Sequence, residues 1–362
     1  MADMFEYLSW RGDLLFTDIP LNSVDALIFS TLVYGDYSGI VPEDGQHPVP
    51  LQVAAEAFLS LPDPERRVRV KSDLRLLRAA ADSPRFRDVQ LSFYRSILIP
   101  KEETQFAAMA FHLPDGTVFL AFRGTDYSLT GWKEDFNMAF SDSVPAQRAA
   151  AAYAEEFAER HPVLLRFGGH SKGGNLAVYA ASKAPEQIRR RILTVYNLDG
   201  PGFTEGFLSH DGYLSMVPKI RTIIPESSII GILLEHRGDF TVIASRQVGV
   251  LQHEPYSWEI MAGDFIRVKQ MSGHSQFVDR TIKNWIRDMS KEERSAYVEA
   301  LFGLLSAGGA NTVQDLLHPK NIRSFFSTLK ADESTRKLLT AEFTELMKAA
   351  ASALPRYSKE KQ

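Results

Sequence analysis

The chain has 362 residues, of which 44% are hydrophobic and 24% are charged, and its formal net charge is −4. This composition is ordinary for a soluble globular protein, and the slightly acidic balance gives no overall basic field that would attract nucleic acid. No cysteine is present, which excludes disulfides, cysteine-ligated metals and a thiol nucleophile.

The N-terminal residues Met1–Glu6 lack a basic segment followed by an apolar stretch, so we expect no signal peptide. The apolar stretches of the chain are interrupted by charges or glycine before the roughly 18 residues that a membrane span requires. We therefore expect a cytoplasmic protein without a transmembrane segment.

The first part of the chain, residues 1–90, has mostly helical patterns, and Asn22 and Ser23 are suited to cap one of these helices. Two apolar runs follow at residues 106–113 and 117–122, separated by Pro114-Asp115-Gly116. A turn sequence between two such runs is typical of a β-hairpin.

The next elements alternate between helices and short apolar runs. A helix is expected over residues 144–160, and strands at residues 163–167, 192–198, 220–224 and 240–244. Such alternation predicts an α/β fold, in which a mostly parallel sheet is flanked by helices. We assign residues 91–270 to the sheet core and residues 271–362 to a helical C-terminal extension, in which Ser290 caps a helix.

The strongest motif is Gly169-His170-Ser171-Lys172-Gly173, which lies between a strand-like run and a helical pattern. A serine at the tip of a sharp strand-to-helix turn needs small residues two positions before and after it, because these positions pack closely. The motif therefore predicts that Ser171 is a nucleophile. The structural alternative is an ordinary tight turn.

A serine nucleophile also needs backbone donors for the oxyanion that forms on the substrate. The N–H of Lys172, the residue after the nucleophile, is one candidate. The second candidate is the N–H of Thr125, which follows a predicted strand end and Gly124.

Three motifs in order resemble those of the class 3 lipases. They are Ala-Phe-Arg-Gly-Thr at residues 121–125, Gly-Trp-Lys-Glu-Asp at residues 131–135 and the nucleophile turn. The resemblance implies the α/β-hydrolase fold, acyl-ester hydrolysis and an oxyanion role for Thr125. Residues 7–13 and 252–258 are similar to a bacterial lipase-like branch of uncharacterised function, so the resemblance covers about residues 5 to 260 and not the C-terminal helices.

Nine histidines compete for the role of base. The chain order of the α/β-hydrolase fold is nucleophile, acid, histidine, which disfavours the histidines that precede Ser171. Of those that follow it, His210 comes too soon after the turn and His318 lies in the C-terminal helical part, which leaves His236, His253 and His274. We select His253 because it follows the last strand-like run after a short loop. His170, within the turn itself, is expected to be structural.

The acid is harder to identify, because residues 224–231 contain no Asp where the class 3 pattern has one. Asp199 ends the predicted strand at residues 192–198, and its Leu-Asp-Gly-Pro setting looks like the alternative acid position of pancreatic-type lipases. We select Asp199, against a plain turn-forming role for it, with Asp239 and Glu226 as the other candidates.

One further motif is typical of a different class of enzyme. Tyr179 and Lys183 match the Tyr-x-x-x-Lys motif of short-chain dehydrogenases, but no Gly-rich dinucleotide loop precedes them. No metal- or cofactor-binding motif is present in the sequence. We therefore expect a serine hydrolase that cleaves small-molecule or lipid esters, with a lidded entrance as a hypothesis for residues 203–216. The alternative is an inactive fold that serves as a binding or scaffold domain.

Overall fold

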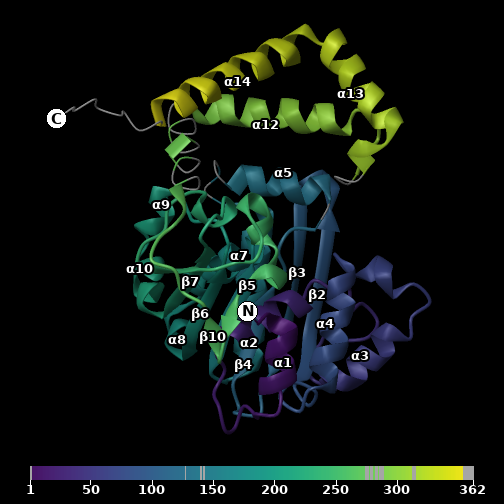
Figure 1. The fold of residues 1–362 in the computed structure, drawn as a ribbon, viewed down its shortest axis with the longest axis vertical. Coiled ribbons are helices and arrows are strands. Elements are labelled where there is room, and N and C mark those ends of the chain that lie inside the picture. Colours follow the sequence, from purple (N-terminus) through teal and green to yellow (C-terminus); the bar gives the residue numbers. More distant parts are fainter. Residues whose placement is uncertain are drawn as a thin grey trace, which may run out of the picture.

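An eight-stranded sheet forms the centre of the protein, and helices cover both of its faces (Figure 1). The computed structural model describes residues 2–126, 128–138, 141, 143–273, 277, 280–281, 284, 289–311 and 315–353. The strands lie side by side in the order of the chain. They are β1 (Val49–Pro50), β2 (Gln90–Ile99), β3 (Thr104–His112), β4 (Val118–Phe122), β5 (Leu165–His170), β6 (Ile192–Leu198), β7 (Ile220–Pro225) and β8 (Phe240–Ile243).

The sheet has an antiparallel and a parallel part. Strands β1 to β4 pair antiparallel, whereas all four pairings from β4 to β8 are parallel. The carboxyl ends of β4 to β8 therefore meet at one edge of the sheet, which is where an α/β protein carries its site. This architecture confirms the predicted mostly parallel sheet flanked by helices.

Most predicted strands lie close to their expected positions. The hairpin of β3 and β4 closes at a turn in which Gly116 has φ +81° and donates its N–H to Leu113 O at 3.0 Å. Strand β6 has the expected bounds, whereas β5 begins at Leu165 and continues through His170. The glycines of the nucleophile turn are thus partly inside the strand.

Strand β2 was not predicted. Phe93 and Tyr94 are consecutive, yet both are buried, because the register with β3 shifts between Ser92 and Arg95. Phe93 has φ +55°, and its carbonyl accepts a hydrogen bond from Tyr153 Oη at 2.8 Å. This β-bulge removes the alternation that identifies a strand in a sequence.

Helices from the two halves of the domain cover opposite faces. The N-terminal helices form one apolar core with the sheet, and α6 and α7 form the other. The helices of the N-terminal half are α1 (Met4–Arg11), α2 (Ser23–Leu32), α3 (Leu51–Leu59) and α4 (Lys71–Asp82). Those that follow β4 are α5 (Leu129–Met138), α6 (Pro145–Arg160), α7 (Lys172–Lys183) and α8 (Glu186–Arg191). The predicted cap of α2 is confirmed, since Asn22 Oδ1 accepts from the N–H of Val24 at 2.9 Å.

The segment for which a lid was considered forms two short helices, α9 (Glu205–Leu208) and α10 (Asp211–Met216). Their aromatic side chains point into the domain. Phe207 stacks on both Phe203 and Tyr179, with ring centroids 4.4 and 5.1 Å apart, and all three are buried. Packing within the segment and against α7 therefore accounts for its buried aromatic residues, whereas Leu214 of α10 is exposed. After β8 the chain forms a small second sheet of β9 (Ile260–Met261) and β10 (Asp264–Phe265).

Three further helices lie beyond α5 in Figure 1: α12 (Lys291–Ser306), α13 (Pro319–Ala331) and α14 (Glu333–Ala353). Ser290 caps α12 as predicted, accepting the N–H of Glu293 at 3.2 Å. Helix α12 contacts α5 through Phe302, whose ring lies 5.6 Å from that of Phe136, and through an ion pair of 2.7 Å between Glu299 and Lys133. Among the described residues, no helix is both long and apolar enough to cross a membrane.

Candidate active site

Ser171 lies at the junction of β5 and α7, in a backbone conformation that non-glycine residues rarely adopt, with φ 60° and ψ −137°. The glycines on both sides explain how such a turn is tolerated. A Cβ on Gly169 would lie 2.2 Å from the backbone of Gly173, and a Cβ on Gly173 would lie 2.0 Å from Phe122 O. The positions two before and two after Ser171 thus leave no room for a side chain, as expected from the glycine spacing.

The loop after β4 lies directly against this turn. A Cβ on Gly124 would be 3.1 Å from Ser171 Cβ and 2.6 Å from His170 O. The backbone of Thr125, the next residue, is therefore beside the serine. Thr125 Oγ1 donates a hydrogen bond to Asp135 Oδ2 in α5. This bond fixes the side chain of Thr125.

The side chain of Lys172 points away from solvent and into a buried polar cluster. Lys172 Nζ donates to Glu134 Oε2 at 3.0 Å and to Gln105 Oε1 at 3.2 Å. Glu134 is fully buried, and its other oxygen accepts the N–H of Ala146 at 2.7 Å. The ammonium group is thus paired and hydrogen-bonded, as a buried charge must be. It joins the turn to α5.

Asp135, the neighbour of Glu134, is only partly enclosed by the protein. Its side chain keeps a third of its surface exposed, yet Oδ1 is enclosed and accepts no hydrogen bond in the described part of the chain. Burial raises the pKa of Asp135 to about 6, although Lys172 and the Thr125 hydroxyl act in the opposite direction. Asp135 is the carboxylate that contacts the loop of Thr125.

The structure brings the selected base and acid together. His253 Nδ1 lies 2.7 Å from Asp199 Oδ2, with Asp199 fully buried and His253 24% exposed. A carboxylate can only accept, so Nδ1 carries a proton, and in the neutral ring the lone pair is on Nε2. Within the described chain neither His253 Nε2 nor Ser171 Oγ has a hydrogen-bond partner.

Asp199 is held by more than the histidine. Its Oδ1 accepts a hydrogen bond from Ser228 Oγ at 2.5 Å, and its N–H donates to Ile223 O at 2.8 Å. A Cβ on Gly231 would lie 2.2 Å from the same Oδ1, so only glycine fits there. The carboxylate is therefore fixed by the loop that follows β7.

His170 connects the nucleophile turn to the segment of the base. Its ring centroid is 4.6 Å from that of His253, and its Nε2 lies 2.8 Å from His253 O. Its Nδ1 lies 3.0 Å from Tyr34 Oη. Burial, and then the proximity of His253 and Arg69, hold the pKa of His170 well below its ordinary value.

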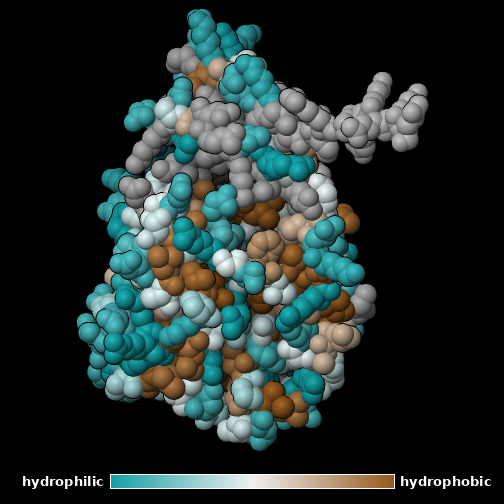
Figure 2. All heavy atoms as spheres, turned by 90° about the vertical axis from the view of Figure 1, so that its left-hand side faces the viewer, coloured by the Kyte–Doolittle hydropathy of each residue, from teal (hydrophilic) through white to brown (hydrophobic). Residues whose placement is uncertain are grey.

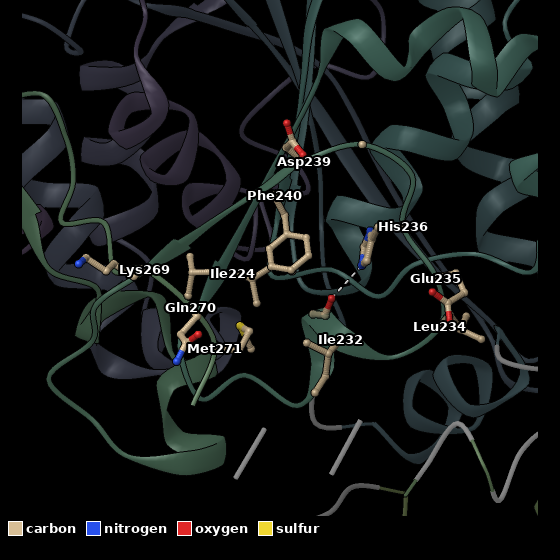
Figure 3. Close-up of a pocket in the computed structure, with 13 residues that line it drawn as sticks. Ile224, Ile232, Leu234, Glu235, His236, Asp239, Phe240, Lys269, Gln270 and Met271 are labelled. Carbon is tan, nitrogen blue, oxygen red and sulfur yellow. Dashed lines mark hydrogen bonds between the residues drawn. The ribbon is translucent and has the colours of Figure 1, made fainter. Parts of the chain in front are cut away.

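The other candidates are elsewhere. His236 and Asp239 line a cavity of about 630 Å³ at the edge of the sheet near β8, where His236 Nε2 lies 2.8 Å from Gly231 O (Figure 3). Glu226 follows β7, and its backbone pairs with Ile243 and Ser272. His274 lies outside the described residues.

The cavity shown in Figure 3 combines an apolar floor with a polar rim, and neither Ser171 nor His253 lines it. Its floor contains Ile224, Val242 and Met271. Gly231 is the part of its lining that contacts Asp199. On the side of the molecule in Figure 2, apolar patches alternate with hydrophilic surface, as on most soluble proteins.

Sequence reasoning did not assign three residues that contact the site: Ser228, Tyr34 and Glu134. Glu134 stands in the Gly-Trp-Lys-Glu-Asp motif, so the motif was a signal, but its contact with Lys172 was not predicted. Ser228 and Tyr34 are separated from their partners by 29 and 136 residues. No local pattern in the sequence indicates such contacts.

Solved lipase structures show low similarity to this chain. A Rhizomucor miehei lipase–propeptide complex is 16% identical, with a TM-score of 0.36 over 71% of this chain and 90% of that one. A deletion mutant of that complex is 15% identical, with a TM-score of 0.37 over 70% and 91%. M37 lipase is 14% identical, with a TM-score of 0.34 over 58% and 68%. No functional conclusion follows from similarities of this size.

No curated protein matches the sequence. The Mbeg1-like family, in contrast, matches residues 80–303, which include β2 to β8, the nucleophile turn, Asp199 and His253. This range is more than half of the chain, and the chain therefore belongs to the Mbeg1-like family.

Proposed function

We propose that this protein is a serine hydrolase with an α/β-hydrolase fold, which cleaves carboxylic esters through an acyl-enzyme on Ser171. The observation that carries the proposal is the hydrogen bond of 2.7 Å between the buried Asp199 carboxylate and His253 Nδ1. This bond leaves a basic Nε2 on a partly exposed histidine, whose ring adjoins the residue before Ser171.

In the proposed reaction, His253 Nε2 takes the proton of Ser171 Oγ as the oxygen attacks the ester carbonyl. Asp199 then stabilises the imidazolium and keeps its orientation. The same proton passes from His253 to the departing alcohol, which leaves the acyl group on Ser171. Water, deprotonated by His253, then attacks the acyl-enzyme. The imidazolium returns this proton to Ser171 Oγ as the bond between Oγ and the acyl carbon breaks, which releases the carboxylic acid.

The oxyanion of each tetrahedral intermediate needs donors that are in place beforehand. Two backbone groups support this role: the N–H of Lys172, at the first position of α7, and the N–H of Thr125, in the loop that lies against Ser171. The first N–H groups of a helix have no partner within the helix, and its dipole favours a negative charge there.

Exposed apolar side chains on the segments that carry the site favour an apolar acyl group as substrate. Val248 and Leu251, close to His253 in the chain, are 75% and 57% exposed, and Trp132 of α5 is 43% exposed. Burying such surface against an acyl chain is favourable at about 25 cal/mol per Å². We therefore assign esters with an apolar acyl chain as the substrate class.

The experiment is labelling with a fluorophosphonate probe, followed by hydrolysis of p-nitrophenyl esters of increasing acyl length. Wild type should be labelled and should hydrolyse the esters, whereas Ser171→Ala should do neither. Ser182→Ala is the matched control. Ser182 is a buried serine of α7, the helix that begins directly after Ser171, and its hydroxyl donates to Val178 O at 2.7 Å. This variant should be labelled like wild type.

Failure of the folded wild type to react with the probe or with any ester would overturn the proposal. It would favour the alternative in which the fold is a binding or scaffold domain.

A further inference from the structure

We propose that His170 is a positioning residue for the catalytic base, which it holds by donating a hydrogen bond to the backbone carbonyl of His253. This inference rests on the proposed function, since it assigns a role in placing His253 beside Ser171. It also gives a task to the N-terminal helices, which provide the groups behind His170.

The chemistry of its two partners fixes the direction of the hydrogen bonds that the His170 ring makes. The carbonyl of His253 can only accept, so the proton of the His170 imidazole is on Nε2, 2.8 Å away. In the neutral ring His170 Nδ1 then has a lone pair, to which Tyr34 Oη donates at 3.0 Å; the same hydroxyl lies 3.5 Å from His170 O. The two contacts together select one neutral tautomer of His170.

The charge of His170 also matters for the proposed reaction. The imidazole of His253 must become positive during the reaction, and its centroid is 4.6 Å from that of His170. A second positive ring at this distance would oppose that step. Burial, and then the proximity of His253 and Arg69, hold the pKa of His170 well below its ordinary value, so the His170 ring is neutral when the proposed reaction places a proton on His253.

His253 lies in a segment, residues 252–258, that we call the base loop and that is anchored to the rest of the protein. Arg69 donates to both carboxylate oxygens of Glu254, at 2.7 and 2.8 Å, and its guanidinium lies 4.9 Å from the Tyr34 ring centroid. Tyr256 Oη donates to Asp73 at 2.7 Å. The side chains of the base loop are thus bonded to the N-terminal part.

Two further hydrogen bonds hold the base loop, one within it and one from the segment that follows β7. Trp258 Nε1 donates to Gln252 O at 2.9 Å, and Gln252 Oε1 accepts the N–H of Ser227 at 2.7 Å. Among the residues named here that bond to the base loop, His170 is the one that belongs to the nucleophile turn. Its contact with His253 O therefore sets the distance between base and nucleophile directly, whereas the other bonds hold the loop as a whole.

The experiment compares three variants with a matched control. His170→Phe keeps a ring but loses both hydrogen bonds. His170→Gln keeps a donor, because the amide nitrogen of Gln and the Nε2 of His are separated from Cα by the same number of bonds. Tyr34→Phe removes the donor to Nδ1. The control is His112→Phe, which removes a partly buried histidine bonded to Ser92 Oγ, remote from Ser171.

With the ester substrates, His170→Phe should lower kcat about 10- to 100-fold with little change in KM, since a misplacement of about 1 Å costs roughly 100-fold in rate. His170→Gln should restore kcat to within about tenfold of wild type, on the same geometric argument. Tyr34→Phe should fall between them, and His112→Phe should keep the wild-type kcat. If folded His170→Phe has the kcat and pH profile of wild type while Ser171→Ala is inactive, the inference is wrong and the proposed function stands.

A second measurement does not need activity. Long-range ¹H–¹⁵N spectra of wild type at neutral pH should show His170 as a neutral Nε2–H tautomer, assigned by its loss in His170→Gln. A protonated or Nδ1–H ring would overturn the inference, whether or not the protein hydrolyses esters. An inactive wild type that shows the Nε2–H tautomer would overturn the proposed function and leave a structural role for His170.

Discussion

Lys172 Nζ and Glu134 Oε2 form an ion pair of 3.0 Å that is almost completely buried, directly after the candidate nucleophile. Glu134 is in α5, and α5 also carries Asp135, which accepts from Thr125, and Phe136, which contacts α12. Helix α5 thus connects the nucleophile turn, the candidate oxyanion loop and the C-terminal helices.

Replacing Lys172 by Met should lower the free energy of unfolding by about 3–5 kcal/mol, because it leaves a buried carboxylate without its partner. Urea denaturation followed by circular dichroism measures this change. Lys172→Met combined with Glu134→Gln should lose less than the two single changes together. The exposed pair of Lys71 and Glu65, 3.2 Å apart, is the control. Lys71→Met should change stability by less than about 1 kcal/mol, and an equal loss for both lysines would contradict the role of burial.

Replacing Asp199 by Asn should lower kcat about 10⁴-fold with the fold intact. The amide would donate to His253 Nδ1, so the imidazole proton would move to Nε2 and the ring would no longer accept from Ser171. Steady-state ester hydrolysis and a spectrum of the folded variant measure both parts. Asp239→Asn is the control, because Asp239 lines the separate cavity. Loss of activity in Asp239→Asn, with Asp199→Asn still active, would show that the acid was wrongly chosen.

His112 should make the protein less stable as the pH falls from about 6.5 to about 4. Burial, and then the neighbouring His161, lower the pKa of His112 to about 4. The unfolded chain therefore takes up the proton first, so the stability is present above pH 6.5 and is lost toward pH 4, by up to about 3 kcal/mol. Denaturation at several pH values should show a shallower acid loss in His112→Phe. Identical slopes for variant and wild type would contradict a buried, neutral His112.

Replacing Phe302 by Ala should detach the C-terminal helices without unfolding the sheet. The Phe302 side chain is 5% exposed and packs on Phe136, and truncating a buried Phe costs about 3–5 kcal/mol. Trypsin should then cut residues 291–353 sooner, while the remaining fragment resists. Phe326→Ala, at a phenylalanine that is 63% exposed on α13, should be cut like wild type. Equal cleavage rates in the two variants would show that α12 is not held by Phe302.

The sharp strand-to-helix turn at Ser171 could be predicted, because glycine spacing and short apolar runs are local features of a sequence. Asp199 and His253 each follow a strand, and the carboxyl ends of parallel strands meet at one edge. Strand β2 was missed because the bulge at Phe93 buries two consecutive aromatic residues. The side-chain role of Lys172 was also missed, since its partner Glu134 lies 38 residues earlier in the chain.

The contact of α12 with α5 has a consequence for shortened forms of this protein. A fragment that stops where the family match stops, at residue 303, would end inside α12 and would lack Asn311, whose carbonyl accepts the N–H of Leu129 at 2.8 Å. The first turn of α5 would lose this anchor, and the partner of the lysine after the nucleophile is in that helix. Trimming the helical end would therefore disturb the contacts that hold Lys172 and the turn at Ser171.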